Sequence, residues 1–166
     1  MSIIIGVDPG LTGAMALLDS QRGVLDIQDI PTEPNGTDSG AMRSWVATRK
    51  TMDLLHDWSV KFDMHREWVG VFIERPIPMP TLPAQTIAAQ FDTFGVLRSL
   101  LGRHAGVNVV NPREWKKLYA LGSDKDASRN LAMRLYPDAQ HWLKRVKDHN
   151  RAESLLIAHW ALTTKD

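Results

Sequence analysis

The residues best placed to do chemistry are two acids, each at the end of an apolar run. Asp8 follows the run Ser2–Val7, and Glu74 ends the run that begins at Glu67. Runs of this length predict buried strands. A carboxylate left unpaired in a protein core costs several kcal/mol or shifts its pKa until it is neutral. A metal cation is the natural partner for such an acid, while Asp8 alone also fits a turn that closes a hairpin.

The predicted last helix offers further ligands, because its first turns hold several polar side chains. The segment K-D-H-N-R-A-E-S-L-L-I-A carries Asp148, His149, Asn150 and Glu153. His149 and Asn150 precede Glu153 by four and three residues, so each shares a helix face with it. The alternative makes Asp148 a helix cap and leaves Glu153 solvated. That alternative does not explain why three elements each present oxygen ligands at one end.

Acids gathered from three elements, in a chain without cysteine, favour hard cations such as Mg²⁺ or Mn²⁺. Two such ions about 3.5–4 Å apart can activate a water molecule and stabilise the leaving oxygen in phosphodiester hydrolysis. The lack of cysteine also excludes disulfides and cysteine-based zinc sites.

The charge of the chain is unevenly distributed. Its 166 residues carry a net charge of +1, yet residues 111–151 hold ten Lys and Arg against five Asp and Glu. Such a segment fits a phosphate-facing surface, and it equally fits a solvated helical face. The length predicts a single domain over residues 1–166. No basic segment precedes the first strand and no apolar stretch reaches about 18–20 residues, so we expect a cytoplasmic protein with no membrane partner.

The pattern of apolar runs predicts an α/β fold. Three antiparallel strands come first and two parallel strands follow, at Ser2–Val7, Gly13–Leu18, Val24–Ile30, Glu67–Glu74 and Gly106–Val110. Helices are predicted at Ala41–His65, Thr81–Arg103, Pro112–Leu118, Asp124–Tyr136 (capped by Ser123) and His149–Thr163. The segment Pro31–Gly40 is rich in breakers and predicts a loop. These elements give a five-stranded mixed sheet flanked by helices.

Three motifs in this order resemble the RuvC family of Holliday junction resolvases. They are I-G-V-D-P-G-L-T-G-A, I-E-R-P and D-H-N-R-A-E-S-L-L-I-A, and the segment N-P-R-E-W-K-K-L-Y-A-L-G-S-D-K-D-A-S-R-N-L-A-M-R-L-Y-P is similar to the compact bacteriophage and prophage type. The resemblance implies an RNase H-like fold and a homodimer. It also implies a crossover junction endodeoxyribonuclease that resolves four-way DNA junctions by symmetric paired nicks, through a two-metal mechanism with Mg²⁺ or Mn²⁺.

Carried over residue by residue, Asp8, Glu74 and Glu153 match the acids of the family. Some members place an acid or a histidine three residues before the final acid, where this chain has Asn150. Asp148 is then the expected metal ligand, with His149 as a ligand or as a base that aids the attacking water. The resemblance thus implies a catalytic set of Asp8, Glu74, Asp148, His149 and Glu153, the four acids of which hold the metal.

The family-like basic segment supplies the expected DNA contacts, Lys116, Lys117, Lys125 and Arg129. The proline-rich loop Arg75–Pro80 follows Glu74 directly, and Ile77 or Met79 is a candidate wedge at the junction centre. The apolar stripe of Thr81–Arg103 is broad enough for both core and dimer interface.

Three other functions fit parts of the sequence. The fold also suits a non-catalytic junction-binding protein, or a nuclease for other branched DNA or for RNA. A sugar kinase or ATPase shares a glycine-rich turn after a strand, but needs two such domains, so no nucleotide cofactor is expected.

Overall fold

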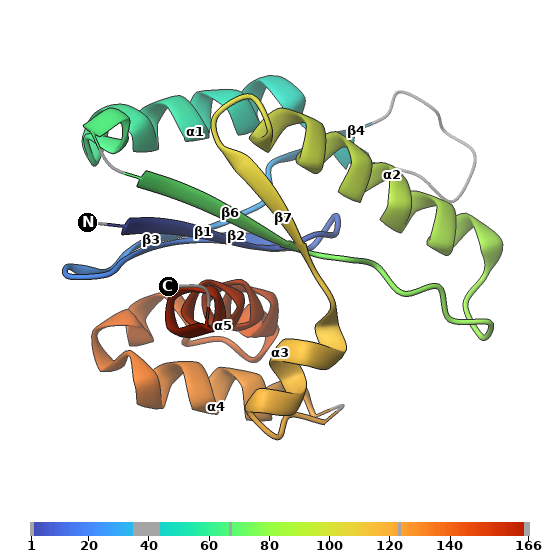
Figure 1. Cartoon of the computed structure of the whole chain (residues 1–166). Helices are drawn as coiled ribbons and strands as arrows, with labels where there is room; N and C mark the ends of the chain where they lie inside the picture. Colours follow the sequence, from blue (N-terminus) through green and yellow to red (C-terminus); the bar gives the residue numbers. More distant parts are fainter. Residues whose placement is uncertain (1, 35–43, 67, 123, 165–166) are drawn as a thin grey trace.

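A five-stranded mixed sheet forms the centre of the molecule (Figure 1). The computed structural model describes residues 2–34, 44–66, 68–122 and 124–164. The strand order is β3-β2-β1-β6-β7, with β1 (Ser2–Asp8), β2 (Ala14–Asp19), β3 (Gly23–Asp29), β6 (Trp68–Glu74) and β7 (Gly106–Val110). The first three strands pair antiparallel, whereas β6 runs parallel to β1 and β7 parallel to β6. The predicted sheet is confirmed, with strand ends shifted by at most one residue.

Helices cover both faces of this sheet (Figure 1). One face carries α1 (Thr48–Lys61) and α2 (Ala84–Leu101), and the other carries α3 (Pro112–Leu118), α4 (Lys125–Leu135) and α5 (His149–Thr164). Strand β1 faces both layers because its side chains alternate: Ile3 and Ile5 join the α1–α2 core, while Ile4 joins the α5 core. Short 3₁₀ segments lie at Met64–Arg66, Pro137–Trp142 and Val146–Asp148.

Helix α5 packs unusually close to β1, and Gly6 makes this possible. A Cβ atom at Gly6 would collide with the backbone of Ser154 and Ala158. The helix therefore lies directly on the central strand, and Ala152, Leu155 and other apolar residues of α5 are fully buried. The close contact fixes where the first turns of α5 meet the end of β1.

The segment before α1 differs from the prediction. Ser44–Val46 forms a strand, β5, that pairs with β4 (Thr32–Pro34), although the sequence predicts helix and loop there. The near-helical spacing of Trp45, Met52, Leu55, Trp58 and Phe62 predicts that Trp45 lies in the core. Trp45 is instead 46% exposed, and its indole N–H donates to Glu33. Cross-strand pairing thus outweighs the helical spacing of the apolar residues. Residues 35–43, which include most of the predicted loop and the start of the predicted helix, lie outside the described residues.

Helix α1 ends at Lys61, four residues before its predicted end at His65, and the ends of the other helices lie within three residues of their predicted positions. Asp124 caps α4 by accepting a hydrogen bond from the backbone N–H of Asp126; Ser123, the predicted cap, lies outside the described residues. Across the described ranges, none of the helices is long and apolar enough to span a membrane.

Candidate active site

Three acids from three distant segments meet at one edge of the sheet. Asp8 ends β1, Glu74 ends β6 and Glu153 lies in the second turn of α5. One carboxylate oxygen from each lies within 4.8 Å of the other two, and all three residues are half-buried. The register explains the meeting, because Val7 pairs with Ile73 and the next residue of each parallel strand is the acid. Glu153 joins them because its neighbour Ser154 packs on Gly6.

Glu74 is held in place by a tryptophan of α3. The indole N–H of the fully buried Trp115 donates to Glu74 Oε2 at 2.7 Å. Burial raises the pKa of Glu74 above its usual value, and the charge of Glu153 adds to this effect. Lys116 and the Trp115 bond only partly offset it. Glu74 is therefore a fixed carboxylate for which a cation would be a strongly favourable neighbour.

Lys116 lies against the three acids. Its Nζ is 3.0 Å from Glu153 Oε2, and Ser128 Oγ donates to the other Glu153 oxygen at 3.3 Å. Burial by itself lowers the pKa of Lys116, but Glu153, Glu74 and Asp8 outweigh burial and raise it. The lysine is thus charged and neutralises part of the acid cluster. The sequence predicts Lys116 only as a DNA contact and does not predict this contact with the acids.

The structure does not bring Asp148 to these acids. Asp148 is 3% exposed and accepts hydrogen bonds from the backbone N–H and the guanidinium of Arg145, at 2.7–2.9 Å. Burial opposes the charge of Asp148, but the Arg145 hydrogen bonds lower its pKa overall. Asp148 precedes Glu153 by five residues, which turns it to another side of the helix. Its carboxylate instead closes the 3₁₀ turn Val146–Asp148, just before α5, by accepting from the backbone N–H of Arg145 in a capping box.

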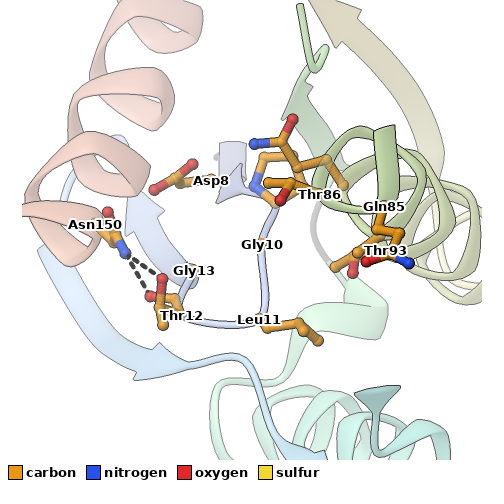
Figure 2. A pocket seen from close by; sticks show the side chains of 12 residues that line it. Asp8, Gly10, Leu11, Thr12, Gly13, Gln85, Thr86, Thr93 and Asn150 are labelled. Carbon is orange, nitrogen blue, oxygen red and sulfur yellow. Dashed lines mark hydrogen bonds between the residues drawn. The ribbon is translucent and has the colours of Figure 1, made fainter. Parts of the chain in front are cut away.

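The first turn of α5 also holds His149 and Asn150, and both are half-buried. Among the described residues, the side chains close enough to share one metal ion are Asp8, Glu74 and Glu153, and His149 is not among them. Asn150 instead donates from Nδ2 to the carbonyl and the hydroxyl oxygen of Thr12 (Figure 2). It thereby ties α5 to the turn that follows Asp8.

That turn, residues 9–13, depends on Gly13. The Gly13 N–H donates to Gly10 O at 3.0 Å, and a Cβ atom at Gly13 would collide with Asp8 O. The turn therefore folds tightly beside Asp8. Sequence reasoning missed the contacts that Trp115, Ser128 and Asn150 make here; only Asn150 carried a signal, its three-residue spacing from Glu153.

The predicted DNA-contact residues differ in their surroundings. Lys117 is exposed on α3. Arg129 forms an ion pair with Asp126 at 3.0 Å and is mostly buried. The side chain of Lys125 lies outside the described residues. Of this set, Lys116 is the described cation that contacts the acids.

Solved structures show which fold this arrangement belongs to. RuvC of Thermus thermophilus in complex with a Holliday junction substrate matches 95% of this chain and 90% of its own, with a TM-score of 0.59 and 13% identity. A second Thermus thermophilus RuvC structure matches 96% of this chain and 95% of its own, with a TM-score of 0.53 and 15% identity. The chain has the RuvC-like, RNase H-like fold. This confirms the fold that the three motifs imply.

Sequence comparison finds a relative over about half of the chain. The Holliday junction resolvase MOC1 of the chloroplast of Chlamydomonas reinhardtii is 37% identical over 97 residues. The match covers 55% of this RuvC-like chain but only 11% of that relative, so the chain spans a small part of the relative's length. No protein-family model matches the chain.

Proposed function

We propose that this RuvC-like chain is a single-domain endonuclease that cuts four-way DNA junctions by hydrolysing phosphodiester bonds. The observation that carries the proposal is the meeting of Asp8, Glu74 and Glu153 within 4.8 Å, one acid from each of the three motifs. The sequence relative is named a Holliday junction resolvase, and a matching structure holds a Holliday junction substrate. Both supports are independent of the acid geometry.

The donor set fits a divalent metal. Three carboxylates and no sulfur ligand suit Mg²⁺ or Mn²⁺, and burial of Glu74 makes a neighbouring cation favourable. Asp8, Glu74 and Glu153 are the residues that would hold it. When bound, a pair of such ions supplies a more acidic water molecule and stabilises the charge on the leaving oxygen.

The protein itself contributes orientation. Asp8 is carried by the central strand, Glu74 is fixed by Trp115, and Glu153 is fixed by Ser128 and Lys116. His149, in the adjacent helical turn, is the candidate general base. We assign Asp148 to holding the 3₁₀ turn that leads into α5, because its oxygens are engaged by Arg145.

Substrate backbone and dimer contacts complete the proposal. Lys116 and Lys117 are the candidate phosphate contacts at the acid edge, with Lys125 and Arg129 further along the basic segment.

Symmetric paired nicks require two active sites, so we propose a homodimer. Its candidate interface is the outer surface of α2, where Phe91 is 38% exposed beside Gly95, Val96 and Leu100.

A synthetic four-way junction incubated with Mg²⁺ tests the proposal. We expect paired nicks from the wild-type chain. In Asp8→Asn the cleavage rate should fall by about 100-fold or more, because Asp8 is itself a proposed ligand, and loss of a residue that only supports a metal ligand already costs about 10–100-fold. Asp53→Asn, on the exposed side of α1, is the matched control and should cut normally.

Three outcomes would contradict the proposal in different ways. Equal cutting by Asp8→Asn would remove the acid cluster from the mechanism. Junction binding without cutting by the wild type would indicate the non-catalytic alternative. Faster cutting of flaps or RNA at the same salt concentration would indicate another nuclease activity on this fold.

A further inference from the structure

A cavity of about 360 Å³ opens directly beside Asp8. Figure 2 shows Asp8 and Asn150 on one side of it, and Gln85, Thr86 and Thr93 of α2 on the other, with Leu11 and Gly13 along the turn between them. The lining residues of α2 are spaced as one helix face, at positions 85, 86, 89, 90 and 93. The cavity therefore lies between the acid edge and the helix layer opposite α3 and α5.

The lining of this cavity mixes polar and apolar groups and is almost uncharged. Apart from Asp8, its polar side chains are amides and hydroxyls: Thr12, Gln85, Thr86, Gln90, Thr93 and Asn150. Lys116, by contrast, comes to the acids from α3, on the other face of the sheet. None of the residues that line the cavity is a lysine or arginine that would pair with a phosphate. The cavity instead suits a neutral group that both donates and accepts hydrogen bonds.

Two carboxamides are available for such a group. Within the described residues, no hydrogen bond is made by the side chain of Gln85 or of Gln90. Ala89 lies between them on the same helix face, and its small side chain leaves space in front of both. A carboxamide presents a donor and an acceptor in one plane, which is the pattern on the edge of a nucleobase.

We propose that this cavity receives a nucleobase next to the cleaved phosphodiester, and that Gln85 and Gln90 set the sequence preference of cleavage. The proposal rests on the nuclease function proposed above. A cavity at the lower end of the usual range for small-molecule sites has room for one base but not for a duplex. Adenine is the expected base, because its adjacent acceptor and donor match a carboxamide in two hydrogen bonds. Phosphate positioning then belongs to α3, and base reading to α2.

Four-way junctions with randomised positions around the cut, sequenced after cleavage in Mg²⁺, test this assignment. We expect the wild type to favour one base at one position, and the double variant Gln85→Ala/Gln90→Ala to lose that preference by about 5- to 150-fold. Gln85→Glu/Gln90→Glu removes the donors, so its preference should move from adenine towards cytosine. Gln140→Ala, at an exposed site outside the cavity, is the control and should keep the wild-type profile.

The outcomes separate this inference from the function on which it rests. A wild type that cuts no nucleic acid overturns the proposed function. A wild type that cuts without base preference, or a double variant that cuts with the wild-type profile, overturns base reading alone. If the alanine variant does not fold, Gln85→Asn and Gln90→Asn shorten each amide by one methylene while keeping its chemistry. An unchanged profile in both overturns the inference as well.

Discussion

Two groups of carboxylates lie around the first turns of α5, and their partners differ. At the acid edge, Asp8, Glu74 and Glu153 all raise the pKa of the same Lys116. At the start of α5, each acid has an arginine of its own: Asp148 pairs with Arg145, and Asp29 of β3 with Arg151. The first group has more negative charge than Lys116 alone can neutralise, and the second is balanced within itself. The acid residue type alone therefore does not identify a metal ligand; the local charge balance does.

The largest expected contrast between the groups is in their response to metal. Glu153→Gln should abolish the rise in melting temperature that Mn²⁺ or Mg²⁺ causes, because one of three ligands loses its charge. Asp148→Asn should keep that rise, although it starts from a lower melting temperature. Thermal unfolding with and without each ion measures both. Loss of the metal response in Asp148→Asn, with the response retained in Glu153→Gln, would reverse our assignment of the two groups.

A smaller contrast is expected in stability without metal. Asp148→Ala should lower the free energy of unfolding by about 1–2 kcal/mol, as for loss of a helix-capping side chain. It removes both the backbone and the guanidinium hydrogen bonds of Arg145. Urea unfolding in EDTA measures the change. The control is Asp138→Ala, an exposed acid in a 3₁₀ segment, which should change the free energy by less than about 0.5 kcal/mol.

The same contrast explains what sequence reasoning could and could not predict. The acid edge was predictable because Asp8 and Glu74 end apolar runs, and neighbouring parallel strands bring their ends together. The pairing of Asp148 was left open, because a helix cap and a metal ligand look alike in sequence. Whether it has an arginine beside it depends on the 3₁₀ turn before α5, which periodicity does not reveal.

Contacts across long stretches of chain were also beyond the sequence. Trp115 reaches Glu74 from 41 residues away, and Ser128 reaches Glu153 from 25. The β4–β5 pair likewise depends on cross-strand contacts, so that a segment read as helix from its apolar spacing forms a strand. Local patterns predicted the elements and their order, while tertiary packing decided which polar groups meet.

A still smaller effect should come from Lys116, the residue that partly neutralises the acid edge. Lys116→Met removes a cation that competes with metal, so Mn²⁺ should bind about fivefold more tightly, the equivalent of about 1 kcal/mol for a partly exposed ion pair. Isothermal titration calorimetry measures the affinity. Lys117→Met changes the exposed neighbour on α3 and should leave it unchanged. Equal effects of the two substitutions would mean that only the overall charge matters.

The smallest expected difference is in pH dependence, where the two groups should have opposite signs. The pKa of Glu74 is raised by folding, so the folded protein holds its proton more tightly than the unfolded chain. Without metal, stability from Glu74 is present below pH 4.5 and is lost as the pH rises through the raised folded value. The pKa of Asp148 is lowered by Arg145, so its contribution is present above about pH 3.8 and is lost as the pH falls through the lowered value.

Urea unfolding in EDTA across this pH range separates the two contributions. Glu74→Gln should remove the loss of stability on the alkaline side, because an amide has no proton to release, while Trp115 can still donate to the amide oxygen. Asp148→Asn should remove the loss on the acidic side and leave the Glu74 slope intact. A wild-type curve that falls only on the acidic side would mean that Lys116 compensates the acid edge fully. The acid edge would then favour a further cation only when the substrate is bound, and not in the protein alone.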